Sequence, residues 1–471
     1  MVFSDIFFVY IFIPVFLGLY FLNSKIAYKN FVLILFSLIF YSWGAAAFLP
    51  LLILTTFIDY LNGLFITKHL GQKKAVLGLI CSLVINLGIL IAFKYSGFIV
   101  MNMNAVTGLN IPVPDITLPI GISFYTFQTT SYVIDVYRGN AKAQKNYFYY
   151  LLYISMFFQL VAGPIVRYST ISEEISSRKV SITEFSEGLT RFIFGLSKKV
   201  IIANTLGGLV AQSLNFTNAP TSVFASWFGI LMFSLQIYYD FSGYSDMAIG
   251  LGRMCGFHFM ENFNYPYISK SASDFWRRWH ISLGSFFKDY VYIPMGGNRK
   301  HQILNLAVVW FLTGLWHGAS WNFILWGLYF GVFIILEKLF LGKVLEKIPA
   351  FFAHLYSLFI IVIGWTLFYF TDMKSLGMCL KSMFGLTDIP LIDEVSKSYL
   401  MNNLFIIIIS ILLSAPIYQL IKGTLIKSEK KSNAILIFSH STKTILNVAL
   451  LVISSLLLVG QTYNPFLYFR F

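Results

Sequence analysis

A histidine lies inside a long apolar stretch of the chain. His317 occurs within residues 312–319 (LTGLWHGA), and no Lys, Arg, Asp or Glu lies between Lys300 and Glu337. Ionisable groups within apolar spans are costly and often functional. Histidine ionises near neutral pH, so it can take a proton from a hydroxyl group. The residue types also allow a structural histidine that bonds a backbone carbonyl, and the flanking glycines would permit close helix packing in either case.

A second histidine follows a basic and aromatic segment. His280 ends the run 276–280 (WRRWH), and residues 273–290 are expected to form an amphipathic helix at the membrane interface. In that position His280 would contact an incoming acyl donor, or else it would only anchor the interface. Four carboxylates in apolar surroundings are each expected to pair with a cation or a backbone donor, in structural roles: Asp59, Asp135, Asp240 and Asp246.

Several kinds of soluble-enzyme site find no support. The sequence has no glycine-rich phosphate loop, no G-x-S-x-G motif and no zinc-ligand spacing. We expect no metal, and the three cysteines are expected to be buried thiols: Cys81, Cys255 and Cys379. Any chemistry must therefore be built between helices.

The composition indicates which elements position these groups. Of 471 residues, 57% are hydrophobic and 11% are charged, whereas an average soluble domain has about 25% charged residues. Apolar blocks of roughly 20 residues predict spans, and the backbone in lipid favours helices. The expected spans are residues 7–22, 31–47, 48–66, 75–93, 147–166, 223–239, 304–319, 321–340, 351–370, 403–420 and 445–460. Residues 119–136 and 192–209 could span, re-enter or lie at the interface. We therefore predict an all-α polytopic membrane protein with about eleven to thirteen transmembrane or re-entrant helices.

The net charge of +14 is concentrated in short loops between the spans. This pattern follows the positive-inside rule and argues against nucleic acid as a partner. It places both termini, including the tail 461–471, outside the cytoplasm, and the first apolar block is read as a retained span. We expect residues 1–471 to form one membrane-embedded domain in contact with lipid, with 240–302 as a cytoplasmic or interfacial segment that belongs to the catalytic region.

A set of motifs spread over nearly the whole chain resembles the membrane-bound O-acyltransferase family of bacterial cell-envelope modification. The branch most similar to this sequence contains the membrane subunits of alginate and peptidoglycan O-acetyltransferases, and the teichoic acid D-alanyl transfer subunit is more distant. The motifs are 118–127 (LPIGISFYTF), 134–139 (IDVYRG), 239–250 (YDFSGYSDMAIG), 262–267 (NFNYPY), 274–283 (DFWRRWHISL), 290–298 (YVYIPMGGN), 315–318 (LWHG) and 464–471 (NPFLYFRF).

The resemblance implies a fold and a set of site residues. It implies helices around a thin central region that a tunnel pierces, with His317 as the catalytic histidine and His280 as the second family histidine. Structural or tunnel-lining roles are expected for Asp246, Trp316 and Asn322.

The resemblance also implies acetyl-CoA as the acyl donor, without a bound cofactor. Acetyl-CoA is cytoplasmic and polar, so moving only the acetyl group through a tunnel avoids moving CoA. Basic side chains at Arg277, Arg278 and Lys288 would attract the CoA phosphates.

The expected function is O-acetylation of a cell-envelope polysaccharide at the cytoplasmic (inner) membrane. Peptidoglycan is our first choice, and alginate or another exopolysaccharide fits as well. The resemblance suggests an extracytoplasmic SGNH-type transferase as the partner. Tyr468, in the tail, is either an acyl relay or an interface anchor. A glycan transporter or flippase with a proton-relay histidine, or a non-catalytic assembly subunit, remains an alternative.

Overall fold

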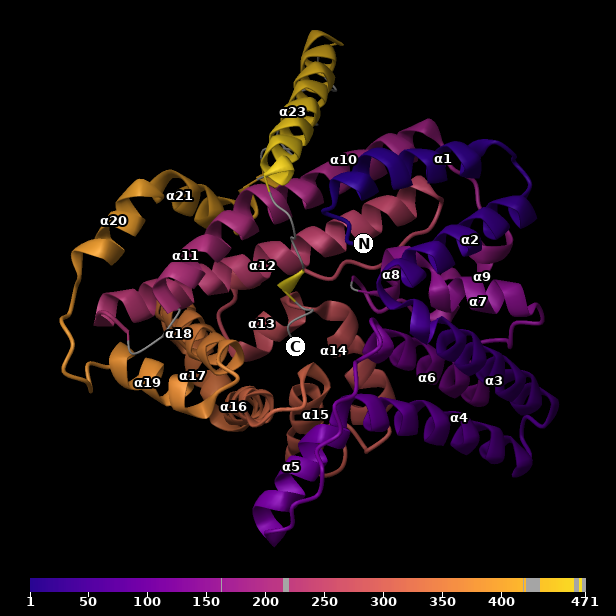
Figure 1. Ribbon diagram of the computed structural model, residues 1–471, viewed down its shortest axis with the longest axis horizontal. Coiled ribbons are helices and arrows are strands. Elements are labelled where there is room, and N and C mark those ends of the chain that lie inside the picture. Colours follow the sequence, from indigo (N-terminus) through magenta and orange to yellow (C-terminus); the bar gives the residue numbers. More distant parts are fainter. Residues whose placement is uncertain (162, 215–219, 418, 421–432, 461–465, 468–471) are drawn as a thin grey trace. The chain divides into compact units, whose positions relative to one another are not determined.

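The protein is almost entirely helical. The computed structural model describes all residues except 162, 215–219, 418, 421–432, 461–465 and 468–471 (Figure 1). Among the described residues, an isolated bridge between Phe263 and Trp279 is the one β-type pairing. The chain divides into two compact units, Met1–Phe192, Ser245–Glu261 and Ser285–Pro294 in unit 1, and Ile193–Tyr244, Asn262–Gly284 and Met295–Phe471 in unit 2. That residues 1–471 form a single domain stays a prediction.

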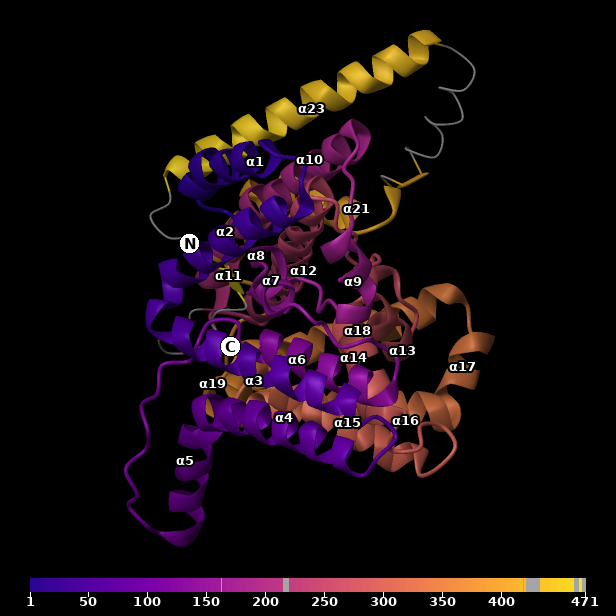
Figure 2. The same cartoon turned by 90° about the vertical axis from the view of Figure 1, so that its right-hand side faces the viewer.

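Unit 1 is a helical bundle in which α3, α4 and α6 pack against one another (Figures 1 and 2). Its helices are α1 (Ile13–Phe21), α2 (Ile26–Ala45), α3 (Leu49–Lys68), α4 (Lys74–Leu90), α5 (Ser96–Thr107), α6 (Ile122–Arg138), α7 (Tyr147–Ser155), α8 (Phe157–Leu160) and α9 (Tyr168–Ser176). Asp59 on α3 accepts hydrogen bonds from Ser82 at 2.5 Å and Asn86 at 2.8 Å, both on α4. Asp135 on α6 accepts one from the Tyr290 hydroxyl at 2.8 Å.

Asp59 corrects one expectation from the sequence. Its hydrogen bonds come from the neutral side chains of two α4 residues, so the expected cation or backbone donor was wrong for this residue. Asp135 accepts from the neutral Tyr290 hydroxyl. It also interacts electrostatically with the cations Arg167 and Arg138. Hydroxyl and amide donors can satisfy a buried carboxylate oxygen as a backbone amide does. A sequence pattern does not distinguish these donors.

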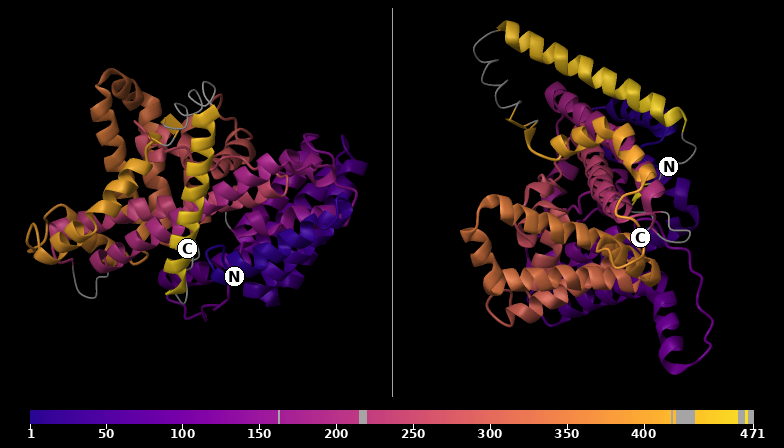
Figure 3. Two further views of the ribbon diagram at one scale, coloured as in Figure 1. Left: turned by 90° about the horizontal axis from the view of Figure 1, so that it is seen from above. Right: turned by 90° about the vertical axis from the view of Figure 1, so that its left-hand side faces the viewer.

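Unit 2 holds both candidate histidines. Its helices are α11 (Asn204–Leu214), α13 (Ala272–Arg278), α15 (Gln302–His317), α16 (Trp321–Leu336), α17 (Gly342–Lys347), α18 (Ala350–Tyr369), α19 (Met373–Met383), α20 (Glu394–Asn402), α21 (Leu404–Leu413) and α23 (Asn433–Val459). Three helices contribute residues to both units: α10 (Ile182–Ser197), α12 (Val223–Met254) and α14 (Ile281–Phe287). The long helix α23 is exposed along most of its length (Figure 3), as suits a lipid-facing helix.

Helices α15 and α16 form an antiparallel pair that glycines bring into backbone contact. A Cβ atom at Gly314 would overlap the carbonyl oxygen of Phe323, and one at Gly327 would overlap the carbonyl oxygen of Trp310. Small residues allow this close approach between apolar helices. The crossing fixes the end of α15, where His317 lies three residues beyond Gly314.

Six helices in the described part of the chain are long and apolar enough to cross a membrane, or up to seven if α20 and α21, bent by 63°, form one span. The all-helical, polytopic fold is thus confirmed, although the segments differ from those expected. Residues 31–47 and 48–66 continue as one stretch, Ile26–Lys68. Residues 147–166 are interrupted at Met156, whose ψ of 114° leaves the helical region. Hydropathy detects apolar length, whereas these joins and breaks depend on local backbone geometry.

Candidate active site

His317 lines a small cavity in unit 2. The residue is 5% exposed, and its ring makes edge contacts with Trp326 and Phe368 at centroid distances of 4.8 and 5.4 Å. The cavity has a volume of about 20 Å³, and its wall is apolar or aromatic apart from His317 and Asp240. A space of 10–15 Å³ on this measure holds roughly one water molecule. The cavity therefore has room for a single small group beside the imidazole.

His280 lies in a tight turn between α13 and α14 with φ of 46°, a left-handed conformation. The expected single helix over residues 273–290 was therefore wrong, because the chain leaves the helical conformation at this turn. The side-chain oxygen of Asn262 accepts the backbone N–H of Ser282 at 3.2 Å and faces His280 Nδ1 at 3.2 Å. Because a backbone N–H can only donate, the facing atom must be the amide oxygen, and Nδ1 must carry the proton. Burial lowers the pKa of His280 to about 3, so the ring is neutral and Nε2 is its basic nitrogen. Nε2 has no hydrogen-bond partner within the described part of the chain.

Trp316 connects the two histidines. Its ring lies 4.9 Å from that of His317 and 5.9 Å from that of His280. Phe241, which lines the cavity, also contacts His280 at 4.7 Å. The structure thus brings together three residues that the sequence analysis singled out.

A buried ion pair borders the same cavity. Lys199 Nζ lies 2.5 Å from Asp240 Oδ1, with side chains 7% and 2% exposed. Asp240 Oδ2 accepts the backbone N–H of Leu467 at 2.7 Å. Asp240 therefore has both the cation and the backbone donor expected of a buried carboxylate. Sequence reasoning did not identify Lys199 or Leu467, since they lie far from Asp240 along the chain.

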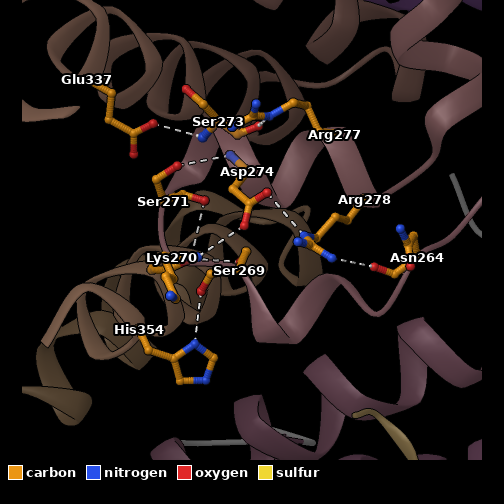
Figure 4. Close-up of polar contacts among 11 residues, drawn as sticks. Asn264, Ser269, Lys270, Ser271, Ser273, Asp274, Arg277, Arg278, Glu337 and His354 are labelled. Atoms are coloured by element: carbon orange, nitrogen blue, oxygen red, sulfur yellow. Dashed lines mark hydrogen bonds and ion pairs between the residues drawn. The ribbon is translucent and has the colours of Figure 1, made fainter. Parts of the chain in front are cut away.

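The two arginines of α13 have different surroundings (Figure 4). Arg278 donates to Asp274 at 3.1 Å and to the carbonyl of Asn264 at 3.3 Å. Arg277 is exposed and donates through Nε to the Ser273 carbonyl at 3.3 Å. Arg277 is more exposed than Arg278, and its bond to the Ser273 carbonyl uses only Nε. Arg277 is therefore better placed than Arg278 to contact a polar ligand.

Glu337 is a residue that the sequence analysis did not assign. Its carboxylate accepts the backbone N–H group of Ser273 at 2.8 Å (Figure 4). It also accepts the backbone N–H group of Ala272 at 2.7 Å and the Tyr356 hydroxyl at 3.1 Å. Glu337 thereby holds the first turn of α13, which carries Arg277 and leads into His280. An acidic residue directly after the apolar run 321–336 was the available signal.

The other expected site residues have separate positions. Asn322 donates to the carbonyls of Leu367 and Phe368 at 3.3 and 3.4 Å, which ties α16 to the end of α18. Asp246 belongs to unit 1, where it accepts from Arg191 at 2.9 and 3.0 Å.

Two further expectations concern Lys288 and Tyr468. Lys288 is exposed and belongs to unit 1. Tyr468 lies outside the described residues. Among the residues that the structure describes, no group of three or more His, Cys, Asp or Glu side chains is placed to hold a metal ion.

Sequence comparisons find relatives that span this chain from end to end. Residues 142–381, which include both histidines, match the model of the MBOAT, membrane-bound O-acyltransferase family. The chain is 37% identical to a probable alginate O-acetylase of Pseudomonas putida over 492 aligned residues, which cover 100% of both chains. It is 31% identical to a peptidoglycan O-acetyltransferase of Helicobacter pylori, covering 100% of this chain and 98% of that protein. A teichoic acid D-alanyltransferase of Bacillus subtilis is 30% identical over 47% of this chain and 59% of its own length. Full-length similarity of this kind makes the chain a member of the membrane-bound O-acyltransferase family, a multi-pass membrane acyltransferase.

Proposed function

We propose that the protein transfers an acetyl group from cytoplasmic acetyl-CoA, through the cavity beside His317, for O-acetylation of a cell-envelope polysaccharide. The observation that carries the proposal is the small apolar cavity beside this histidine, in a chain similar from end to end to an alginate O-acetylase. An acetyl group is small and fairly apolar, and it matches such a space. A cavity of about 20 Å³ favours a two-carbon acyl group over a long one.

In the proposed reaction His317 is the general base. It accepts the proton of an attacking hydroxyl, whose oxygen forms a bond to the carbonyl carbon of the thioester. The carbon–sulfur bond breaks, and the CoA thiolate takes up the proton from the imidazolium. His280, neutral and with an unprotonated Nε2, accepts a hydrogen bond from a hydroxyl group in the same region.

The donor is proposed to approach along α13. Exposed Arg277 offers a cation for a CoA phosphate. Lys288, an exposed cation of unit 1, is proposed independently as a residue that attracts CoA phosphates. Arg278 is already engaged by Asp274, so we assign it to holding the segment in shape. The basic loops then lie in the cytoplasm and both chain termini outside, at the inner membrane.

The acceptor is proposed to be a polysaccharide outside the cytoplasm, reached through an SGNH-type partner. The two full-length relatives act, by name, on alginate and on peptidoglycan. The sequence identity is higher to the alginate relative, 37%, than to the peptidoglycan relative, 31%. This does not favour our first choice, peptidoglycan, so the test includes both polymers. Tyr468 is proposed as the first hydroxyl to receive the acetyl group, because a phenol is a better leaving group than an alkyl alcohol for onward transfer.

The test uses the full chain in liposomes with acetyl-radiolabelled CoA. Wild type is expected to release CoA, whereas His317→Ala is expected to release it at least about 100-fold more slowly, in line with loss of a general base. Arg277→Gln is expected to raise KM with little change in kcat. Label on wild-type protein that disappears in Tyr468→Phe would support the relay. Cells expressing each variant are then analysed for acetylated peptidoglycan and alginate.

Equal CoA release by wild type and His317→Ala would refute the catalytic assignment. Transport of a labelled glycan by wild type that is lost in His317→Ala, with no acetyl transfer in any variant, would support the flippase class with a proton-relay histidine instead. Unchanged envelope acetylation in His317→Ala cells would support a non-catalytic assembly subunit.

A further inference from the structure

A buried carboxylate holds residues 466 and 467 in the wall of the histidine cavity. The two oxygens of Asp240 have different partners, Lys199 Nζ at 2.5 Å and the backbone N–H of Leu467 at 2.7 Å. A carboxylate removed from water is costly unless its charge is balanced and its oxygens are bonded. Lys199 supplies the balancing charge, and the second oxygen is left to bind a main-chain amide 227 residues away in the sequence.

The side chains of this segment occupy space next to His317. Phe466 and Leu467 are 2% and 8% exposed, and both line the cavity. The Phe466 ring packs against Phe241 at 5.6 Å and Tyr244 at 5.1 Å, both on α12. The backbone hydrogen bond to Asp240 and this aromatic packing both hold the segment, and its side chains fill volume that a longer acyl chain would need.

We propose that Asp240, with Lys199 as its counter-ion, is a positioning residue that fixes Phe466 and Leu467 against the cavity, and that these two side chains restrict the transferred acyl group to two carbons. The inference rests on the proposed function, because it takes the cavity as the place of the acyl group. A space of about 20 Å³ receives a methyl group, whereas two further methylene groups would overlap the wall that Leu467 forms.

The first test compares acetyl-CoA with butyryl-CoA as donors for the full chain in liposomes. Leu467→Ala and Asp240→Asn are each expected to reduce the preference for acetyl, measured as the ratio of kcat/KM values, by about tenfold, the usual effect of one or two methylene groups in a tight pocket. Asp393→Asn is the matched control. Asp393 also accepts a backbone amide in unit 2, from Ser396 at 2.9 Å, but does not line the cavity, so this variant is expected to keep the wild-type ratio.

The second test measures accessibility and needs no turnover. Cys255 and Cys379 are buried as expected, but Cys81 is exposed, contrary to the expectation from the sequence. Phe466→Cys is therefore made in a Cys81→Ser background and treated with a small maleimide. The introduced thiol is expected to react slowly with Asp240 intact and faster after Asp240→Asn, while Asp393→Asn leaves it protected.

Each outcome decides a separate point. Equal labelling with and without the Asp240 carboxylate would overturn the positioning role. A preference for acetyl that Leu467→Ala does not change would overturn the restriction on acyl length. If wild type releases CoA from neither thioester, the proposed function fails, and the labelling still decides whether Asp240 holds the segment.

Discussion

Replacing Glu337 by alanine removes the acceptor that holds the first turn of α13. The backbone N–H groups of Ala272 and Ser273 donate to this carboxylate at 2.7 and 2.8 Å, and Glu337 is 8% exposed. A buried amide left without an acceptor costs about 1–3 kcal/mol, so two amides cost at most about 6 kcal/mol. Ala272 is fully buried but Ser273 is half-buried, so water relieves part of the cost for Ser273. We therefore expect a loss of about 2–4 kcal/mol for Glu337→Ala, and about half of that for Glu337→Gln, which keeps one acceptor oxygen.

The assay is thermal unfolding of the purified protein in detergent, together with the KM for acetyl-CoA. Glu337→Ala is expected to unfold at a lower temperature and to have a raised KM, because α13 carries Arg277. Glu346→Ala is the control, since Glu346 is an exposed carboxylate on α17 of the same unit. The reasoning would be refuted if Glu337→Ala matched Glu346→Ala in both unfolding temperature and KM.

Two further predictions concern the helix crossing and the second histidine. Gly327→Ala is expected to force α15 and α16 apart, with a cost of about 1–3 kcal/mol and reduced CoA release, whereas Gly377→Ala, whose Cβ would meet no atom within 4 Å, is expected to preserve both stability and activity. His280 has a pKa near 3 when folded and about 6.5 when unfolded, so the unfolded state binds its proton first as the pH falls. Between these two pKa values this residue lowers the free energy of unfolding by about 1.4 kcal/mol per pH unit. Wild type should thus lose more unfolding free energy between pH 7 and pH 5.5 than His280→Gln, and equal losses would contradict the neutral, buried state of this ring.

The helical membrane fold and the buried position of His317 could be predicted from particular residues. The low charge content requires lipid-facing helices, and a histidine in an apolar run flanked by Gly314 and Gly318 indicates a packed and chemically special position. Gly314 does lie in backbone contact with α16. These inferences depend only on charge content and on the spacing of residues within one segment, and both can be read from the sequence.

Contacts between distant segments could not be predicted in the same way. The bond from Ala272 to Glu337 joins residues 65 positions apart, and nothing near either residue specifies the other. The same holds for Leu467 and Asp240. The partners of Asp59 were predicted wrongly because Ser82 and Asn86 are ordinary residues in an apolar helix, and they become donors only when α3 and α4 pack together.

The sequence separations of the site contacts imply an order in which the site is assembled during folding. Asn262 and His280 are 18 positions apart, and Gly314 and Phe323 belong to consecutive helices. Closing such short loops costs little entropy, whereas the contact between Asp240 and Leu467 closes a loop of 227 residues. We therefore expect the two histidines to reach their relative orientation early, within a locally formed helical framework. Leu467 would reach the cavity only after the rest of the chain had folded. A partly folded protein would therefore have His317 in position before the cavity could shield a reacting thioester from water.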